Sequence, residues 1–339
     1  MTKSFGTLPN GRQATLYTIS CGKITVKVTD FGATLVSALV PDRNGVVADV
    51  ILGYDDANGY LTSDGYLGAT VGRNANRIGG SAFELNGKTV KLPPNEKGNN
   101  LHSGVDSFHL RLWDVEFYAD NVIVFRLESP DGDQGFPGKA VIRVTYELDP
   151  MGALHISYDG DCDQDTVFNM TNHSYFNLAG HDHPELAMDQ VLTIPGGFFC
   201  PDDDENIPTG EERDVEGTPF DFRKPKAIGR DSNTDYEPLH LQGGYDHNFQ
   251  VYSNPAAILE SPDGGRSMYV YTDLPGIQFY SGNYLTERQG KDGVTYKLRG
   301  GICLETQYFP NALNHPEWVQ PFTKAGERWH SETIYRFTW

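Results

Sequence analysis

A carboxylate and an amide stand two residues apart near the C-terminal end of the chain, in a stretch with little other charge. Residues 301–311 read GICLETQYFPN, which is typical of a short strand that ends in a Pro-Asn turn. Because side chains alternate along a strand, Glu305 and Gln307 share one face and the apolar Leu304 lies on the other. A carboxylate without a partner on a covered sheet face is costly, so Glu305 is either held by hydrogen bonds or used as a base. We interpret Glu305 as a catalytic base.

Histidines in two polar stretches could complete an acid–base pair with this carboxylate. Residues 167–178 are expected to form one long strand, with aromatic and methionine side chains on one face and His173 on the other, polar face. His102 lies in a loop rich in Gly and Asn. An imidazole and a carboxylate on either side of a bound molecule can deliver and remove protons in one site. By residue type alone, a structural role for His173 and a solvent-exposed His102 fit as well, and Arg77 could tie a loop down through an ion pair.

Short strands dominate the rest of the chain, and they are the elements that must position these groups. Residues 82–90 predict a hairpin with Asn86-Gly87 at its tip. About fifteen to twenty short strands at such spacing predict an all-β fold, one large antiparallel β-sandwich that forms a single domain over residues 1–339. The Asp- and Pro-rich segment 201–241 is expected to be a loop that wraps the outside.

Charge and cysteine content limit the classes of partner and compartment. The 339-residue chain has 46 acidic and 27 basic residues and a formal net charge of -19, which argues against nucleic acid, an anionic membrane surface or a polyphosphate as partner. No segment has the roughly 20 apolar residues that span a bilayer, and residues 1–15 lack the apolar run of a signal peptide. The four cysteines form no Cys-x-x-Cys pair and fit buried thiols. We therefore expect a cytoplasmic protein with a neutral ligand.

Five motifs carry a resemblance to a known family. They are GRNANRI at 72–78, NLHSG at 100–104, TNHSYFNL at 171–178, GYDHNF at 244–249 and LETQYFPN at 304–311. In this order and at roughly this spacing they resemble the aldose 1-epimerase (galactose mutarotase) family, over effectively the whole chain. No one motif is decisive, but the five together are specific.

The resemblance implies a fold, an activity and a set of site residues. The fold would be the galactose mutarotase-like supersandwich, and the activity would interconvert the α and β anomers of free hexoses such as D-glucose and D-galactose. Glu305 matches the general base at the C1 hydroxyl, His173 the general acid at the ring oxygen, and His102 a second histidine nearby. The positions that hold sugar hydroxyls are matched by Asn76, Arg77, Asp246 and Gln278. The resemblance implies no cofactor and no metal, so a monosaccharide is the expected partner, and monomer and homodimer stay equally open.

Anomer exchange gives the acid–base pair a definite task. The hemiacetal opens when O1 loses a proton and the ring oxygen gains one, and it closes on the opposite face after rotation about the C1–C2 bond. Closure reverses each proton transfer, so the pair is reset without a cofactor. We expect Glu305 and His173 to rest with opposite charges, which would lower the pKa of Glu305 and raise the pKa of His173.

Other functions fit some of the same residues. A metal enzyme could use His102, His173, Asp246 and Glu305 as ligands, although no two of them have the i, i+2 or i, i+4 spacing of preformed sites. A glycoside hydrolase could pair Asp246 with Glu305, and a non-catalytic sugar-binding module could use aromatic side chains for stacking. A hexose-6-phosphate 1-epimerase would need more basic residues than Arg77 at the pocket. The sequence leaves open the preferred sugar among glucose, galactose, xylose and disaccharides, and the role of the acidic segment 202–214.

Overall fold

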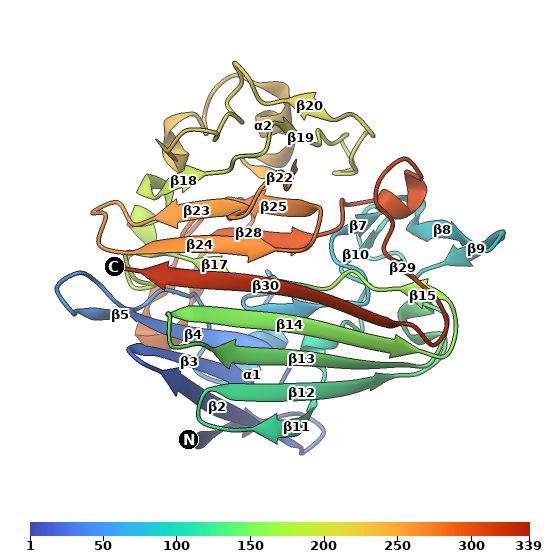
Figure 1. Cartoon of the computed structure of the whole chain (residues 1–339), viewed down its shortest axis with the longest axis horizontal. Helices are drawn as coiled ribbons and strands as arrows, with labels where there is room; N and C mark the ends of the chain where they lie inside the picture. Colours follow the sequence, from blue (N-terminus) through green and yellow to red (C-terminus); the bar gives the residue numbers. More distant parts are fainter.

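The computed structural model describes residues 1–339. Most of its long strands lie in two packed layers (Figure 1). One layer is a nine-stranded antiparallel sheet. Its strands, in spatial order, are β11 (Asp114–Tyr118), β12 (Val122–Ser129), β13 (Ala140–Leu148), β14 (Ala153–Cys162), β30 (Arg328–Thr338), β24 (Ser267–Thr272), β23 (Ala257–Glu260), β18 (Val191–Thr193) and β21 (Lys226–Ala227). In Figure 1 the central strands of this sheet follow one another across the face turned to the viewer.

Two smaller sheets lie behind it in this view (Figure 1). The five-stranded sheet consists of β1 (Thr2–Thr7), β2 (Gln13–Cys21), β3 (Ile24–Thr29), β4 (Thr34–Pro41) and β5 (Val47–Asp49). The six-stranded sheet has the order β17 (Tyr175–Phe176), β28 (Ile302–Gln307), β25 (Gly276–Tyr280), β22 (Asp246–Gln250), β19 (Phe198–Phe199) and β20 (Arg213–Asp214). The six-stranded sheet carries Glu305.

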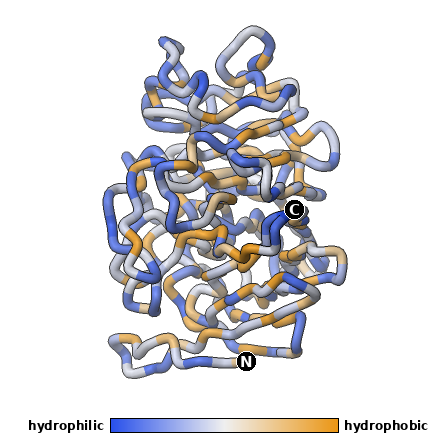
Figure 2. The backbone as a smooth tube through the Cα atoms, turned by 90° about the vertical axis from the view of Figure 1, so that its left-hand side faces the viewer, coloured by the Kyte–Doolittle hydropathy of each residue, from blue (hydrophilic) through white to orange (hydrophobic).

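Apolar side chains from all three sheets meet in one core. Buried and half-buried positions alternate along β13, as expected for a strand with one face on the core. The core contains Val26 of β3, Ile142 of β13 and Leu304 of β28, so it lies between the two layers. Figure 2 shows the corresponding change between hydrophobic and hydrophilic residues along the chain. The prediction of a strand-rich sandwich is confirmed.

Helices are few and short in this fold. The α-helices are α1 (Ala57–Thr62) and α2 (Glu237–Gln242). None of the helices has the length and apolar character needed to cross a membrane. The hairpin predicted at 82–90 is present as β8 (Ala82–Leu85) and β9 (Lys88–Lys91), and both tip residues, Asn86 and Gly87, have the positive φ that this turn requires.

The prediction of one long strand over 167–178 is wrong. The segment is divided into β15 (Thr166–Val167), β16 (Thr171–His173) and β17, which pair with β29 (Phe322–Thr323), β6 (Ala69–Val71) and β28, respectively. Between β15 and β16 the backbone N–H of Asn169 donates to the carbonyl of Arg73, and the Asn169 side chain accepts a hydrogen bond from the backbone N–H of Tyr308. Each short piece can therefore join a different sheet.

The prediction of an outer loop over 201–241 is only partly right. The segment forms much of the upper end of the molecule in Figure 1, with β20 and α2. Two of its aromatic residues, Phe220 and Phe222, are nevertheless fully buried in the main core. The expected number of strands was also too low, because many of the thirty strands have only two residues.

Candidate active site

Three neighbouring strands of the six-stranded sheet form the floor of the site. The register places Glu305 of β28 directly opposite Gln278 of β25. Asp246 of β22 stands opposite Tyr280, one row away. Leu304, the neighbour of Glu305, is part of the main core. Because side chains alternate, Glu305 and its row face away from that core.

A cavity of about 270 Å³ opens on this face of the sheet. It brings together six of the seven predicted site residues: Asn76, Arg77, His102, His173, Asp246 and Glu305. The seventh, Gln278, is buried and does not line the cavity; its side-chain amide donates to Asp246 Oδ1 at 2.8 Å. Gln278 is thus placed to orient Asp246 rather than to contact a ligand.

His102 and Asn76 hold each other through two hydrogen bonds. The short ladder between β7 (Arg77–Ile78) and β10 (Asn100–Leu101) brings their loops together. The backbone N–H of Asn76 donates to His102 Nδ1 at 3.1 Å, and the backbone N–H of His102 donates to the Asn76 carbonyl at 3.0 Å. Burial lowers the pKa of His102 well below its usual value, with help from the nearby His173 and Arg77. A neutral ring whose Nδ1 accepts a hydrogen bond carries its proton on Nε2, so His102 can donate a hydrogen bond at that atom.

The same hydrogen bond bears on the metal alternative. The ligand atoms of His102, His173 and Glu305 lie within 4.8 Å of one another, a donor set that could hold a metal ion. A metal at Nε2 of His102 would need the lone pair of that nitrogen. In the neutral ring Nδ1 accepts a hydrogen bond from Asn76, so the ring proton is on Nε2 and no lone pair is free there. The arrangement at His102 therefore suits hydrogen-bond donation better than metal ligation.

Glu305 is almost fully buried. Its Oε2 lies 3.7 Å from His173 Nε2 and receives no hydrogen bond from the protein. Burial raises the pKa of Glu305 well above its usual value; the charge of Asp246 raises it further, and Arg77 opposes the shift. The expectation of a lowered pKa is wrong, because the loss of water around the carboxylate outweighs the attraction of nearby positive charge.

His173 shows the complementary shift. Cys303 Sγ lies 3.6 Å from Nδ1, and Nε2 faces Glu305. Burial lowers the pKa of His173 to about 4, so the expectation of a raised pKa is also wrong. The buried site therefore disfavours both charged forms, the carboxylate of Glu305 and the imidazolium of His173.

Arg77 is fixed by a two-point ion pair with a residue that the sequence reasoning missed. Its Nε lies 2.6 Å from Glu96 Oε2, and its Nη2 lies 3.3 Å from Glu96 Oε1. Glu96 also lines the cavity. Burial raises the pKa of Asp246, and the positive charge of Arg77 opposes this shift. The ion pair proposed from the residue type is therefore present, and Arg77 still faces the cavity.

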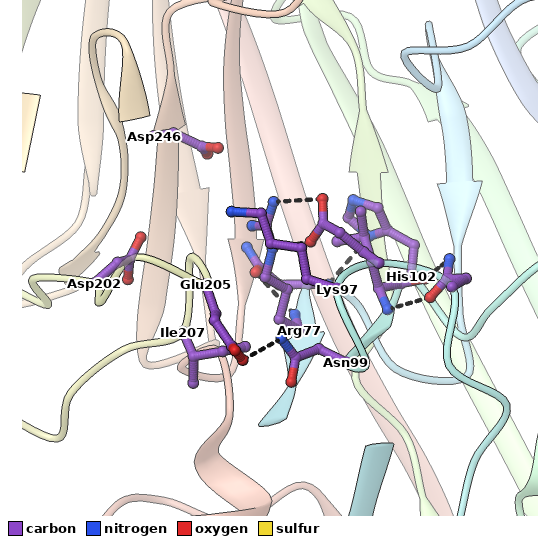
Figure 3. A network of polar contacts seen from close by, with 12 residues as sticks. Arg77, Lys97, Asn99, His102, Asp202, Glu205, Ile207 and Asp246 are labelled. Carbon is purple, nitrogen blue, oxygen red and sulfur yellow. Dashed lines mark hydrogen bonds and ion pairs between the residues drawn. The ribbon is translucent and has the colours of Figure 1, made fainter. Parts of the chain in front are cut away.

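The acidic segment 202–214 reaches the loop that carries Glu96 (Figure 3). Lys97 Nζ donates to the carbonyl of Asp204 at 2.8 Å, and Asn99 Nδ2 donates to Glu205 Oε2 at 3.3 Å. Figure 3 shows Glu205 reaching Asn99 beside Arg77. The acidic segment thus supports the wall of the cavity on the side of Arg77.

Further lining residues were missed or given no role by the sequence reasoning. They are Asp64, Gly65, Tyr66, Glu96, Leu101, Tyr175, Tyr280 and Tyr284. A usable signal was present for Tyr175, which stands in the TNHSYFNL motif on the same face as His173. Leu101 stands beside His102 in the NLHSG motif, and Tyr280 lies two residues after Gln278 on β25. The remaining residues sit in segments whose approach to Glu305 depends on the fold.

The chain is similar to known proteins in its sequence and in its fold. The sequence model of the family described as aldose 1-epimerase matches residues 15–336. The chain is 38% identical to galactose mutarotase of Homo sapiens, over 98% of this chain and 97% of that protein. It is 36% identical to aldose 1-epimerase of Escherichia coli, over 97% and 96% of the two chains. Its structure is similar to that of galactose 1-epimerase from Lactobacillus acidophilus, with a TM-score of 0.87, 28% identity and coverage of 100% and 98%.

Proposed function

The chain belongs to the aldose 1-epimerase family, and from this premise we propose that it interconverts the anomers of free hexoses by proton transfer at Glu305 and His173. The observation that carries the proposal is the buried pair itself, with Glu305 Oε2 3.7 Å from His173 Nε2 at one cavity wall. A hexose has two oxygens that must exchange protons when its ring opens, and the pair offers one group for each.

The pKa shifts suggest how the pair works. Without a bound sugar the pair would hold one proton, and we place it on Glu305, because burial raises the pKa of Glu305 and lowers the pKa of His173. Sugar hydroxyls that replace water at the pair would let this proton move to His173, which leaves Glu305 as the base. Ring opening then takes the O1 proton to Glu305 and delivers the His173 proton to the ring oxygen. The open-chain complex has the neutral pair that the buried site favours, and closure on either face reverses both transfers.

The remaining residues provide binding and orientation. His102 donates from Nε2 toward the cavity, and Arg77, Asn76 and Asp246 offer donors and acceptors for sugar hydroxyls. A phosphorylated sugar fits less well, since Arg77, the one basic residue of Lys or Arg type in the lining, is already paired with Glu96. The polarimetry described below, with both sugars, decides whether glucose or galactose is the preferred substrate.

We further propose that residues 1–339 act as a single domain in the cytoplasm. The main core includes Ile19 near one end of the chain and Phe337 near the other, which supports one folding unit. The four cysteines are unpaired, as is usual in a reducing compartment.

Polarimetry of freshly dissolved α-D-glucose and α-D-galactose tests the proposal. The protein should speed the decay of rotation without changing the final value. Glu305→Gln and His173→Asn should each reduce the rate by about 10²–10⁴-fold. Glu332→Gln is the matched control, because Glu332 also contacts a histidine, His155 at 3.1 Å, but on the nine-stranded sheet away from the cavity. It should keep the wild-type rate.

Three other results would contradict this assignment. A wild-type protein that leaves the spontaneous rate unchanged on both sugars excludes mutarotation of these hexoses. Full activity in Glu305→Gln or His173→Asn removes the residue concerned from the proton transfers. Loss of activity on exhaustive chelation, with recovery on addition of a metal, would favour the metal enzyme instead.

A further inference from the structure

Aromatic rings from separate parts of the chain pack around the imidazole of His173. The rings of Tyr66 and Tyr175 lie tilted against it, with centroid distances of 5.8 and 5.2 Å. The rings of His102 and Tyr280 meet it edge to face, at 5.6 and 6.1 Å. This packing leaves His173 only 6% exposed although it lines the cavity.

Tyr66 has a backbone conformation that is unusual for an aromatic residue. Its φ of 57° lies in the left-handed region, which a bulky side chain adopts only when its surroundings hold it there. From this position the Tyr66 ring also contacts His102, at a centroid distance of 4.7 Å. A single residue thus packs against both histidines of the site.

Two hydrogen bonds join the turn of Tyr66 to the segment of His173. The hydroxyl of Tyr175 donates to the carbonyl of Gly65 at 2.8 Å. The backbone N–H of Gly68 donates to the carbonyl of His173 at 2.9 Å. Gly68 is also required by packing, because a Cβ there would overlap the carbonyl of Leu35. The turn and the histidine are therefore held in one fixed relation.

We propose that Tyr66 and Tyr175 are positioning residues that fix the orientation of the His173 imidazole and keep water away from it. This inference rests on the proposed function, in which His173 serves the ring oxygen. Tyr66 supplies the ring that faces the cavity, and Tyr175 supplies both a second ring and the hydrogen bond that holds the turn. Neither residue needs to exchange a proton.

The proposal connects the packing with the acid–base behaviour of His173. Burial is the main cause that lowers the pKa of His173 to about 4, and these tyrosine rings provide part of the burial. The titratable groups that face His173 are Tyr66, His102, His109, Tyr175, Tyr280, Cys303 and Glu305. Removal of one tyrosine ring should admit water without changing the other groups of this set.

Tyr66→Leu tests the role of the ring, with polarimetry across pH as the measurement. We expect kcat to fall about tenfold or more, because the imidazole loses its fixed orientation. The acid limb, which is the fall in rate at low pH, should have its midpoint moved from about pH 4 toward the ordinary histidine pKa of 6.5. Tyr66→Phe, which keeps the ring, should restore the wild-type limb and most of kcat. Tyr17→Leu is the matched control, because Tyr17 of β2 is a half-buried tyrosine that packs against the rings of Tyr118 and Phe125 and does not line the cavity.

A second measurement keeps the test independent of turnover. NMR titration of isotope-labelled histidine, with the His173 signal identified by its loss in His173→Asn, reports the imidazole directly. Tyr66→Leu should raise the pKa of that signal, and Tyr175→Phe should raise it less, since only the hydrogen bond to Gly65 is lost. Circular dichroism shows whether each variant is folded.

The outcomes separate this inference from the proposed function. If the wild type accelerates mutarotation but Tyr66→Leu keeps both its kcat and its acid limb, Tyr66 merely lines the cavity and the inference is overturned. An unshifted His173 titration in folded Tyr66→Leu overturns it as well. If the wild type shows no mutarotation, the proposed function fails, and the NMR titration still decides whether the tyrosine rings control His173.

Discussion

The nine-stranded sheet and the segments that build the cavity follow different structural rules. In the sheet, β12, β13 and β14 have eight, nine and ten residues, and their backbones are satisfied by continuous ladders. Around the cavity, β7, β10 and β17 have two residues each. Tyr66, Asn76 and His102 all have positive φ there. Continuous strand pairing stabilises the nine-stranded sheet. Around the cavity the backbone is irregular, and this irregularity lets side chains from separate segments converge.

The largest effect on stability should come from the sheet. Ile142 of β13 is fully buried in the main core. Ile142→Ala removes apolar contacts and leaves a cavity, so the free energy of unfolding should fall by about 2–5 kcal/mol. The kcat of the folded enzyme should stay at its wild-type value. Urea denaturation and polarimetry at low temperature measure the two quantities, and a large loss of kcat in folded protein would mean that the two regions are not separable.

Glu305→Gln should show the reverse pattern, with little activity and no loss of stability. The folded state raises the pKa of Glu305, so it favours the protonated carboxyl over the ionised one. The stability that this provides is fully present below the unfolded pKa near 4.5 and is lost as pH rises through the folded pKa. A neutral glutamine avoids that loss. Denaturation at alkaline pH should therefore find the variant at least as stable as the wild type, and a clearly less stable variant would show that the carboxylate has a structural role.

The dependence of kcat/KM on pH should be bell-shaped in the free enzyme. As pH falls through about 4, His173 gains a proton while Glu305 is already protonated, so no base remains. As pH rises through the raised pKa of Glu305, the pair loses its shared proton, so no acid remains. The two apparent pKa values belong to the pair rather than to either residue. An acid limb near the ordinary histidine value would indicate that water reaches the cavity segments more freely than their packing suggests.

The smallest effect is expected from the ion pairs. Glu96→Gln loosens Arg77, a residue proposed to bind hydroxyls, so KM should rise about two- to fivefold with little change in kcat. Glu116→Gln is the matched control, because Glu116 binds Arg143 in the same two-point manner on the nine-stranded sheet. It should leave both kinetic constants unchanged. Equal effects of the two variants would show that Glu96 acts only through general stability.

Much of the candidate site could be predicted because the motifs place chemistry-bearing side chains at fixed positions. Glu305, His173 and His102 line one cavity together with Arg77, Asn76 and Asp246. Gln278 was assigned to the same group, but its side chain is used to hold Asp246. Glu96 and Tyr66 carried no local pattern, because a polar loop or a Gly-rich turn looks the same whether or not it meets a cavity.

The sequence by itself determined the strand-rich fold, because alternation and turn residues act over a few neighbouring positions. It also determined which residue types could transfer protons. The direction of the pKa shifts at Glu305 and His173 depends on the tertiary structure, since burial comes from the surrounding rings and strands and reverses the shifts expected for an isolated ion pair. The contact of Tyr66 with His102 and His173 also depends on the tertiary structure, because the turn that carries Tyr66 meets β16 and β17 only when segments distant in the sequence pack together.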